Sequence, residues 1–129
     1  MDTTQLKRIP LFSDAPDEEL KQVAAFAQAK EVEEGTEVVS EGGFSRELLA
    51  IEDGTAEVTR DGEKIADLGP GDIFGEAGML DDSMRSATVT ATSRLKLISM
   101  GHFEVKRLKK DAPAVYERIE KLVEERSGG

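Results

Sequence analysis

The chain has 129 residues and lacks cysteine altogether, and its only histidine is His102. Without cysteine, a disulfide framework and a zinc site with thiolate ligands are both excluded. A lone histidine cannot supply the several imidazole ligands used by metal-binding β-barrels. We therefore expect neither a metal ion nor a cofactor in this protein.

Long apolar runs are also absent. No stretch approaches the roughly 18 apolar residues that a membrane-spanning helix needs. The first residues, Met1 to Arg8, lack the apolar segment of a secretory signal peptide. The absence of cysteine fits a reducing compartment. These features predict a cytoplasmic protein with no membrane partner.

Basic residues are scarce. Lysine and arginine number 17 against 27 aspartates and glutamates, which gives a formal net charge of −10. DNA-binding domains gather cations on one face, because neutralising phosphates supplies much of their affinity. The densest basic cluster here is Lys106-Arg107 with Lys109-Lys110, which is typical of a solvated helix end near the negative pole of the helix dipole. The composition argues against nucleic acid as a partner of this chain by itself.

The pattern along the chain predicts one domain, residues 1–129, in three parts. Residues 1–30 read as helical, with apolar positions spaced by three and four from Leu20 to Ala27. Residues 31–100 contain many short valine-, isoleucine- and threonine-rich segments separated by glycines, and Asp61-Gly62 between two of them is a strong hairpin signal. Residues 101–126 read as two helices divided near Pro113. This order predicts a mainly β fold with flanking helices, a jelly roll or barrel.

One segment between these strands, from Gly71 to Val89, suggests a binding site. Arg85 is its only basic residue, and its planar guanidinium matches a phosphate or a carboxylate. Glycines at 71, 75 and 78 would let backbone N–H groups point into a common space and form an anion nest. Glu76 would accept hydrogen bonds from a sugar hydroxyl. Together these groups describe a pocket for one small phosphorylated nucleotide.

The same residues resemble a known family. The sequence from Phe74 to Leu80, followed by Arg85-Ser86-Ala87-Thr88-Val89, looks like the phosphate-binding cassette of cyclic nucleotide-binding domains, a family that includes the catabolite activator protein and the regulatory subunits of protein kinase A. The opening residues Ile9 to Ser13, the glycine-containing turns and the closing helices are similar as well. The resemblance therefore covers nearly the whole chain, and it implies a β jelly roll with an N-terminal helix, a short cassette helix and two C-terminal helices.

The resemblance also implies a role for each site residue. Arg85 would bind the cyclic phosphate and Glu76 the ribose 2′-hydroxyl, while Gly75 and the backbone N–H of Ala77 would line the pocket and Ser86 would donate to the phosphate. Relatives often cover the purine with an aromatic residue from a closing helix, and Tyr116, the only tyrosine, is the candidate for such a lid. The alternative for Tyr116 is packing at the edge of the domain. Ser86 does not settle the choice of base, and cyclic AMP is weakly favoured over cyclic GMP.

The leading hypothesis is thus a regulatory binding module that signals through its C-terminal helices and is not an enzyme, since no nucleophile–base pair is visible. The alternative is a domain of the same fold that binds no nucleotide and serves dimerisation or protein interaction. The last helix carries an apolar stripe of Val115, Ile119, Leu122 and Val123. We expect part of that stripe to remain uncovered, which favours a homodimer, or docking on a separate or fused effector.

Overall fold

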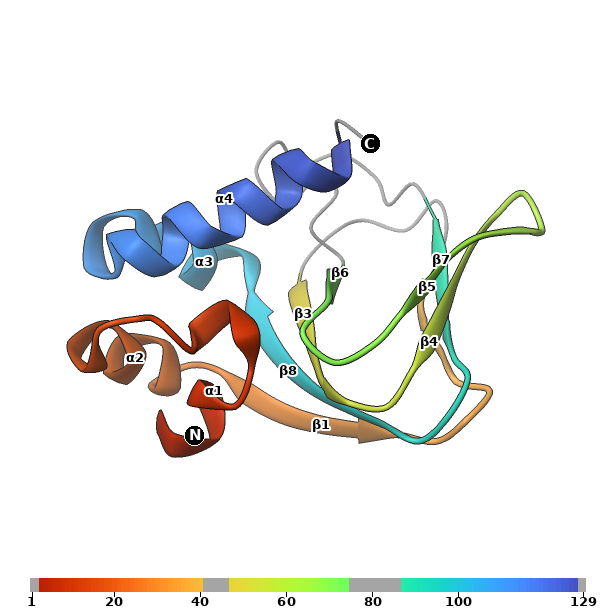
Figure 1. The fold of residues 1–129 in the computed structure, drawn as a ribbon, viewed down its shortest axis with the longest axis horizontal. Coiled ribbons are helices and arrows are strands. Elements are labelled where there is room, and N and C mark those ends of the chain that lie inside the picture. The colour runs from red at the N-terminus through yellow and green to blue at the C-terminus, as the bar shows by residue number, and fades with distance from the viewer. Residues whose placement is uncertain (1–2, 41–46, 75–86, 128–129) are drawn as a thin grey trace.

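The structure is a computed structural model that describes residues 3–40, 47–74 and 87–127, with side chains at all of these except His102 and 122–127. Figure 1 shows the helices gathered on one side and the strands on the other. In chain order the elements are α1 (Thr3–Lys7), the 3₁₀ helix η1 (Pro10–Phe12), α2 (Asp17–Ala24), β1 (Gln28–Val32), β2 (Glu37–Val39), β3 (Glu47–Asp53), β4 (Ala56–Arg60), β5 (Glu63–Leu68), β6 (Ile73–Phe74), β7 (Thr88–Ala91), β8 (Leu95–Gly101), α3 (His102–Asp111) and α4 (Pro113–Ser127).

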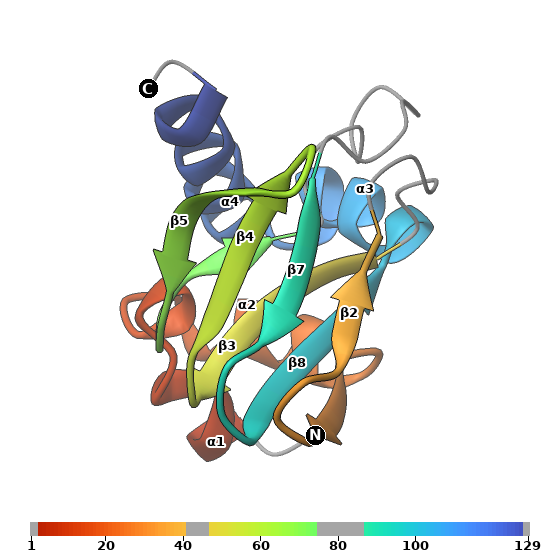
Figure 2. The same cartoon turned by 90° about the vertical axis from the view of Figure 1, so that its right-hand side faces the viewer.

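The described strands form two four-stranded antiparallel sheets. The first has the order β1-β8-β3-β6 and the second β2-β7-β4-β5. Figure 2 shows the second sheet from its outer side, with the first sheet behind it. The predicted mainly β jelly roll with flanking helices is therefore confirmed.

Strand β3, inside the first sheet, is buried on both faces. Leu49 and Ile51 of β3 point between the two sheets, whereas Leu48 and Ala50 point toward the helices. This explains the continuous apolar run Leu48 to Ile51, since a strand covered on both sides needs no polar face. We call the cluster between the sheets the roll core; it contains Val39, Leu49, Ile51, Ala56, Leu68, Phe74, Val89, Ala91, Leu95 and Leu97.

The second cluster, the helix-side core, joins the first sheet to the helices. From the sheet come Leu48, Ala50, Ile73, Ile98 and Met100. From the helices and their connections come Leu6, Ile9, Leu11, Phe12, Leu20, Val23, Ala27, Val105, Leu108, Ala112, Val115 and Ile119. Because β8 faces both clusters and continues directly into α3, the sheet and the C-terminal helices form one packed unit.

The hairpin predicted at Asp61-Gly62 is confirmed. Asp61 has φ 52° and Gly62 has φ 81°, so both central residues adopt the left-handed conformation of a type I′ turn. The turn joins β4 to β5, and Arg60 pairs with Glu63 across it.

The N-terminal boundary differs from the prediction. Helix α2 ends at Ala24 and β1 begins at Gln28, whereas the pattern predicted helical structure to residue 30. β1 is an edge strand in which only Val32 is half-buried, so it lacks the alternation of apolar and polar residues by which strands are recognised. Pro16 occupies the position before the first helical residue, Asp17.

The C-terminal helices form where they were predicted, but the apolar stripe of α4 is used differently. Val115 and Ile119 are each only 1% exposed and belong to the helix-side core. Helix α4 contacts α3, η1 and α2 (Figure 1), so this half of the stripe is covered within the chain, and the expectation that part of the stripe stays uncovered now concerns the other half alone. Leu122 and Val123 lie outside the residues whose side chains are described. Among the described helices, none combines the length and the apolarity needed to cross a membrane.

Candidate functional site

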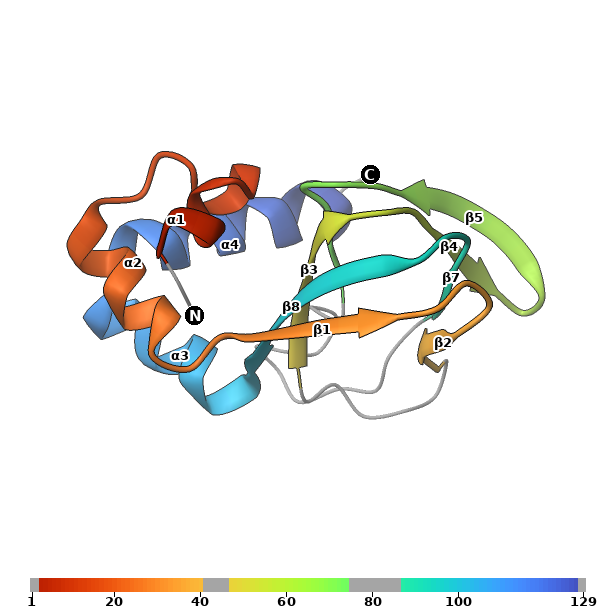
Figure 3. The ribbon, with the colours of Figure 1, turned by 90° about the horizontal axis from the view of Figure 1, so that it is seen from below.

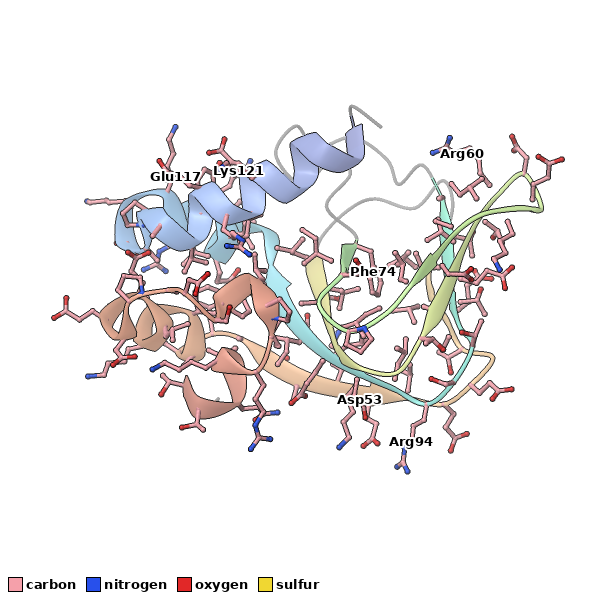
Figure 4. All side chains as sticks on the ribbon, in the orientation of Figure 1. Asp53, Arg60, Phe74, Arg94, Glu117 and Lys121 are labelled. Atoms are coloured by element: carbon pink, nitrogen blue, oxygen red, sulfur yellow. The ribbon has the colours of Figure 1, made fainter. Side chains whose placement is uncertain are left out.

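The segment that carries the predicted nucleotide site connects the two sheets. Phe74, at the end of β6 in the first sheet, is the last described residue before it, and Ala87, which precedes β7 in the second sheet, is the first described residue after it. Figure 4 labels Phe74, whose side chain belongs to the roll core. The predicted binding residues themselves lie outside the described residues; they are Gly75, Glu76, Ala77, Arg85 and Ser86.

The turn that leads into this segment is tightly held. The carboxylate Oδ2 of Asp72 accepts a hydrogen bond of 2.8 Å from the backbone N–H of Gly69, and the N–H of Asp72 donates to the carbonyl of Gly69 at 3.0 Å. The backbone of the turn is also bonded to β3, since the N–H of Ile51 donates to the carbonyl of Asp72 at 2.9 Å. The start of the predicted cassette is thus fixed to the centre of the first sheet.

Gly71 belongs to this turn and not to an anion site. Its φ of +93° confirms that the position needs the left-handed conformation of glycine. However, its N–H donates to the carbonyl of Ile51 at 2.9 Å, so this group is already used by the fold. A Cβ at this position would lie 2.9 Å from Cγ of Pro10 in η1. The prediction that Gly71 contributes to a nest of N–H groups is therefore wrong, and its role is the close packing of the turn on the N-terminal helices.

The exit from the segment is held by the second sheet. Thr88 pairs with Thr59 of β4, and Val89 pairs with Val58 of β4 and Val39 of β2. Because β7 lies between β2 and β4, it has a partner strand on both sides. The two ends of the segment are therefore fixed to different sheets.

A polar cluster that the sequence analysis missed lies in the first sheet, at the end where the chain leaves β6. In the first sheet, Lys30 Nζ contacts Oε2 of Glu47 at 2.8 Å, and the hydroxyl of Ser99 donates to the same oxygen. By strand alternation, Glu47 and Ser99 share the face of Leu49 and Leu97, which lie in the roll core.

This cluster gives the roll core one hydrophilic end. Glu47 lies two residues before Leu49, which pairs with Phe74, so the cluster is at the end of the sheet where the chain leaves β6. Ser99 is only 6% exposed, and burial of a hydroxyl is costly unless it is hydrogen-bonded, as it is here. The available signal was Ser99 in the strand Leu95 to Met100, where its spacing from Leu95 and Leu97 puts it on the same face as these two apolar residues.

Tyr116 lies on the helical side of the molecule. Its ring is half-buried and packs against the helix-side core, not against the roll core. Burial, with a smaller contribution from the carboxylate of Glu120, raises the pKa of the Tyr116 phenol. This position corresponds to packing at the edge of the domain, the alternative to a lid.

The start of α4 is held by a residue from α2. Ala112, before the helix, has no side chain that can cap it, and Pro113 has no N–H. Oε1 of Glu19 instead accepts hydrogen bonds from the N–H groups of Ala114, at 2.9 Å, and Val115, at 3.1 Å. A carboxylate at this end also interacts favourably with the helix dipole. The contact joins residues 95 and 96 positions apart and ties the last helix to the N-terminal one.

Comparison with known proteins decides the family. The sequence profile of the family described as "Cyclic nucleotide-binding domain" matches residues 29–111, which include both sheets, α3 and the whole segment from 75 to 86. The chain belongs to the cyclic nucleotide-binding domain family. The family resemblance seen in the sequence is therefore confirmed.

Curated relatives show where such a domain occurs. The chain is 40% identical over 105 residues to a cAMP-dependent protein kinase regulatory subunit of Yarrowia lipolytica, an alignment that covers 80% of this chain and 28% of the relative. It is 27% identical over 121 residues to a cyclic nucleotide-gated potassium channel of Rhizobium etli, which covers 94% of this chain and 34% of the channel. This cyclic nucleotide-binding domain thus spans only about three-tenths of the length of these relatives.

A solved structure shows the same fold. The catabolite activator protein of Thermus thermophilus superposes with a TM-score of 0.80 and 26% sequence identity, covering 91% of this chain and 57% of that protein. The likeness agrees with the jelly roll described above.

Proposed function

We propose that this cyclic nucleotide-binding domain is a regulatory module that binds cyclic AMP in preference to cyclic GMP and has no catalytic activity of its own. The observation that carries the proposal is the family match over residues 29–111, because it contains every candidate residue between 75 and 86. The Yarrowia lipolytica relative, the regulatory subunit of a cAMP-dependent protein kinase, supports the choice of nucleotide.

In this proposal the binding residues keep the roles that the family resemblance implies. Arg85 binds the cyclic phosphate, Glu76 accepts a hydrogen bond from the ribose 2′-hydroxyl, and Gly75, Ala77 and Ser86 complete the phosphate site. The turn at Asp72 and strand β7 support these roles, since they fix both ends of the segment to the sheets. The packing of Tyr116 on the helix-side core favours a structural role for that residue over a lid.

Calorimetric titration of the purified chain with cyclic AMP and cyclic GMP tests the proposal. We expect saturable binding of one nucleotide per chain, tighter for cyclic AMP. Arg85→Ala should weaken binding by about 2–5 kcal/mol, the cost of removing one partner of a desolvated charge pair. No saturable heat with either nucleotide would contradict the proposal.

Arg94→Ala is the matched control for Arg85→Ala. Arg94, labelled in Figure 4, lies on the connection between β7 and β8. Its Nε contacts Oε1 of Glu31 at 2.6 Å in a solvent-exposed ion pair. Exposed pairs contribute about 0–1 kcal/mol to stability, so this variant should bind nucleotide like the wild-type chain. Equal losses in both arginine variants would mean that general electrostatics, and not a specific phosphate contact, governs binding.

The sugar contact has a separate test. Glu76→Gln should lower affinity for cyclic AMP by about 1.5–3 kcal/mol, the range for a hydrogen bond to a charged group. The same substitution should change affinity for the 2′-deoxy analogue much less, since that ligand lacks the hydroxyl. Equal losses for both ligands would assign Glu76 to support of the segment.

We propose that binding is transmitted through α3 and α4 to an effector in the cytoplasm, either fused to this domain or on a separate chain. β8 supports this route because it lies between β1 and β3 and continues into α3. A ligand can move these helices only by as much as it favours one of their arrangements. Hydrogen exchange of α3 and α4 with and without nucleotide tests the proposal, and identical exchange would contradict it.

The alternative, a domain that binds no nucleotide and pairs through α4, has less support than the sequence suggested. Val115 and Ile119, half of the apolar stripe behind it, are buried within the chain. A homodimer through α4 would have to rely on Leu122 and Val123. Sedimentation over a range of protein concentrations distinguishes a monomer from such a dimer.

A further inference from the structure

Helix α3 presents a stripe of cations that begins with an aromatic ring. Phe103, Lys106, Arg107 and Lys110 follow one another at spacings of three, one and three residues, so they lie on one side of the helix. All four are exposed, and Phe103 is 76% exposed. The opposite side of α3 is buried in the helix-side core through Val105 and Leu108. We call these four exposed residues the α3 stripe.

The helix dipole explains only part of this stripe. Cations in the last turn of a helix are favoured by its negative pole, which accounts for Lys109 and Lys110. Lys106 and Arg107 lie before that turn, and the contact of Arg107 Nη2 with Oδ2 of Asp111 is 4.0 Å long and exposed. The dipole also gives no reason for a phenylalanine at the surface.

A groove with an apolar floor adjoins the stripe. It lies between α2 and α3, which run side by side in Figure 3, and it encloses a cavity of about 270 Å³. Ala25, Phe26 and Leu108 supply its apolar surface. The other residues that line it are polar or charged, namely Gln22, the carboxylates Glu104 and Asp111, and the cation Arg107. The cavity is smaller than the roughly 300–1,000 Å³ of small-molecule pockets, so its size suits one or two side chains of a peptide.

Charge identifies the kind of partner. The chain as a whole carries a formal charge of −10, and the run from Lys106 to Lys110 is its densest group of cations. A partner that seeks this face must therefore be acidic and must make close contact, because the rest of the domain repels it. An extended anionic surface such as a membrane or a nucleic acid would meet that repulsion over a wide area, whereas a short peptide would not.

We propose that the α3 stripe and the groove beside it bind an acidic peptide segment of a partner protein. An apolar side chain of the peptide enters the groove against Phe26 and Leu108, and flanking carboxylates contact Arg107 and Lys110. The proposal uses none of the predicted nucleotide-binding residues, because the residues that line the groove come from α2, the residues that follow it, and α3.

Fluorescence polarisation with synthetic peptides tests this proposal. The probe is a labelled peptide in which a leucine is flanked on both sides by runs of glutamate, and companion peptides carry alanine in place of leucine, or lysine in place of glutamate. We expect saturable binding of the leucine peptide that weakens as salt is raised. The alanine peptide should bind at least several-fold more weakly, and the lysine peptide should not compete.

Variants locate the binding face. Arg107→Glu and Lys110→Glu should each weaken binding of the leucine peptide about tenfold, and Phe103→Ala several-fold. Lys121→Glu is the matched control, because it makes the same change of charge at an exposed position of α4, labelled in Figure 4. It should change affinity less than twofold. Circular dichroism checks that all variants fold.

Several results would overturn the proposal. One is the absence of saturable binding by the wild-type chain, and another is an equal loss in Lys121→Glu, which would indicate unspecific electrostatics. Binding to vesicles rich in phosphatidylglycerol without peptide binding would assign the stripe to a membrane. An apparent molecular mass that rises with protein concentration in the wild-type chain, but not in Lys110→Glu, would assign the α3 stripe to contact with a second copy of this chain.

Discussion

The capping of α4 by Glu19 makes a quantitative prediction about stability. In Glu19→Ala the N–H groups of Ala114 and Val115 lose the carboxylate oxygen that accepts from them at 2.9 and 3.1 Å. Removing a helix cap costs about 0.5–2 kcal/mol, typically about 1, and loss of a negative charge near a helix N-terminus costs about 0.3–1 kcal/mol. Because the two estimates describe partly the same interaction, we expect a loss of about 1–2 kcal/mol.

Chemical unfolding in urea measures this loss directly, and thermal unfolding should show a fall in Tm of about 3–8 °C for a chain of this size. Glu18→Ala is the matched control. Glu18 is the neighbouring residue, is exposed, and shares with Glu19 the first turn of α2, so both variants lose the same favourable charge there. The difference between the two variants therefore isolates the contact with α4.

Two further measurements separate capping from a general loss of stability. Glu19→Gln keeps an acceptor oxygen but not the charge, so its loss should be about half that of Glu19→Ala. The amide hydrogens of Ala114 and Val115 should exchange with solvent faster in Glu19→Ala than in the wild-type chain. The exchange of the β3 and β8 amides should change only as much as the lower global stability requires. The reasoning is refuted if Glu19→Ala and Glu18→Ala are equally stable and the two amides exchange alike.

Three other predictions concern the fold and the single tyrosine. Gly54→Ala should be clearly more destabilising than Gly35→Ala in urea unfolding. Both positions have positive φ, so alanine would be strained by about 1–3 kcal/mol at either one. A Cβ at Gly54 would also clash with the carbonyl oxygen of Arg94, whereas a Cβ at Gly35 would have no atom within 4 Å. Ile98→Ala, at a site that is 0% exposed, should cost about 2–5 kcal/mol, and Ile65→Ala, at 49% exposure, no more than about 0.5 kcal/mol; similar losses would contradict the assignment of the cores. The phenolate absorbance of Tyr116, free of overlap because the chain has no tryptophan and no other tyrosine, should titrate at higher pH in the folded than in the urea-unfolded chain. Since the folded pKa is raised, the associated stability is present below the ordinary value of roughly 10 and is lost as pH rises through the folded pKa. An unshifted titration would contradict the packing of Tyr116, and a shift on adding cyclic AMP would favour the lid.

Much of the fold follows from local sequence signals. The type I′ hairpin at Asp61-Gly62 needs only two residues that tolerate positive φ between two strand-forming segments. The two C-terminal helices follow from the spacing of their apolar residues and the break at Pro113. Such features could be predicted because each depends on residues close together in the chain.

The binding residues of the candidate site stay a prediction from the sequence, and one residue that was grouped with them has another role. The cassette residues from Gly75 to Ser86 resemble a known motif, and the match over residues 29–111 agrees with that resemblance. Gly71 was wrongly grouped with them, because glycine permits both an anion nest and a tight turn, and only the pairing of its N–H with Ile51 shows which applies. The contact of Ser99 with Glu47 joins residues 52 positions apart, so no local pattern could predict it.

The sequence by itself determined most of the helices and strands, though not where β1 begins, because backbone preference and periodicity act over a few residues. Tertiary structure alone decided what each apolar face covers. It placed Leu48 against the helices and Leu49 between the sheets, buried Val115 and Ile119 within the chain, and made Glu19 the cap of a helix that begins 94 residues later, at Pro113. The physical reason is that burial and capping depend on which elements, distant in sequence, pack against each other. The residues next to a side chain in the sequence do not specify those contacts.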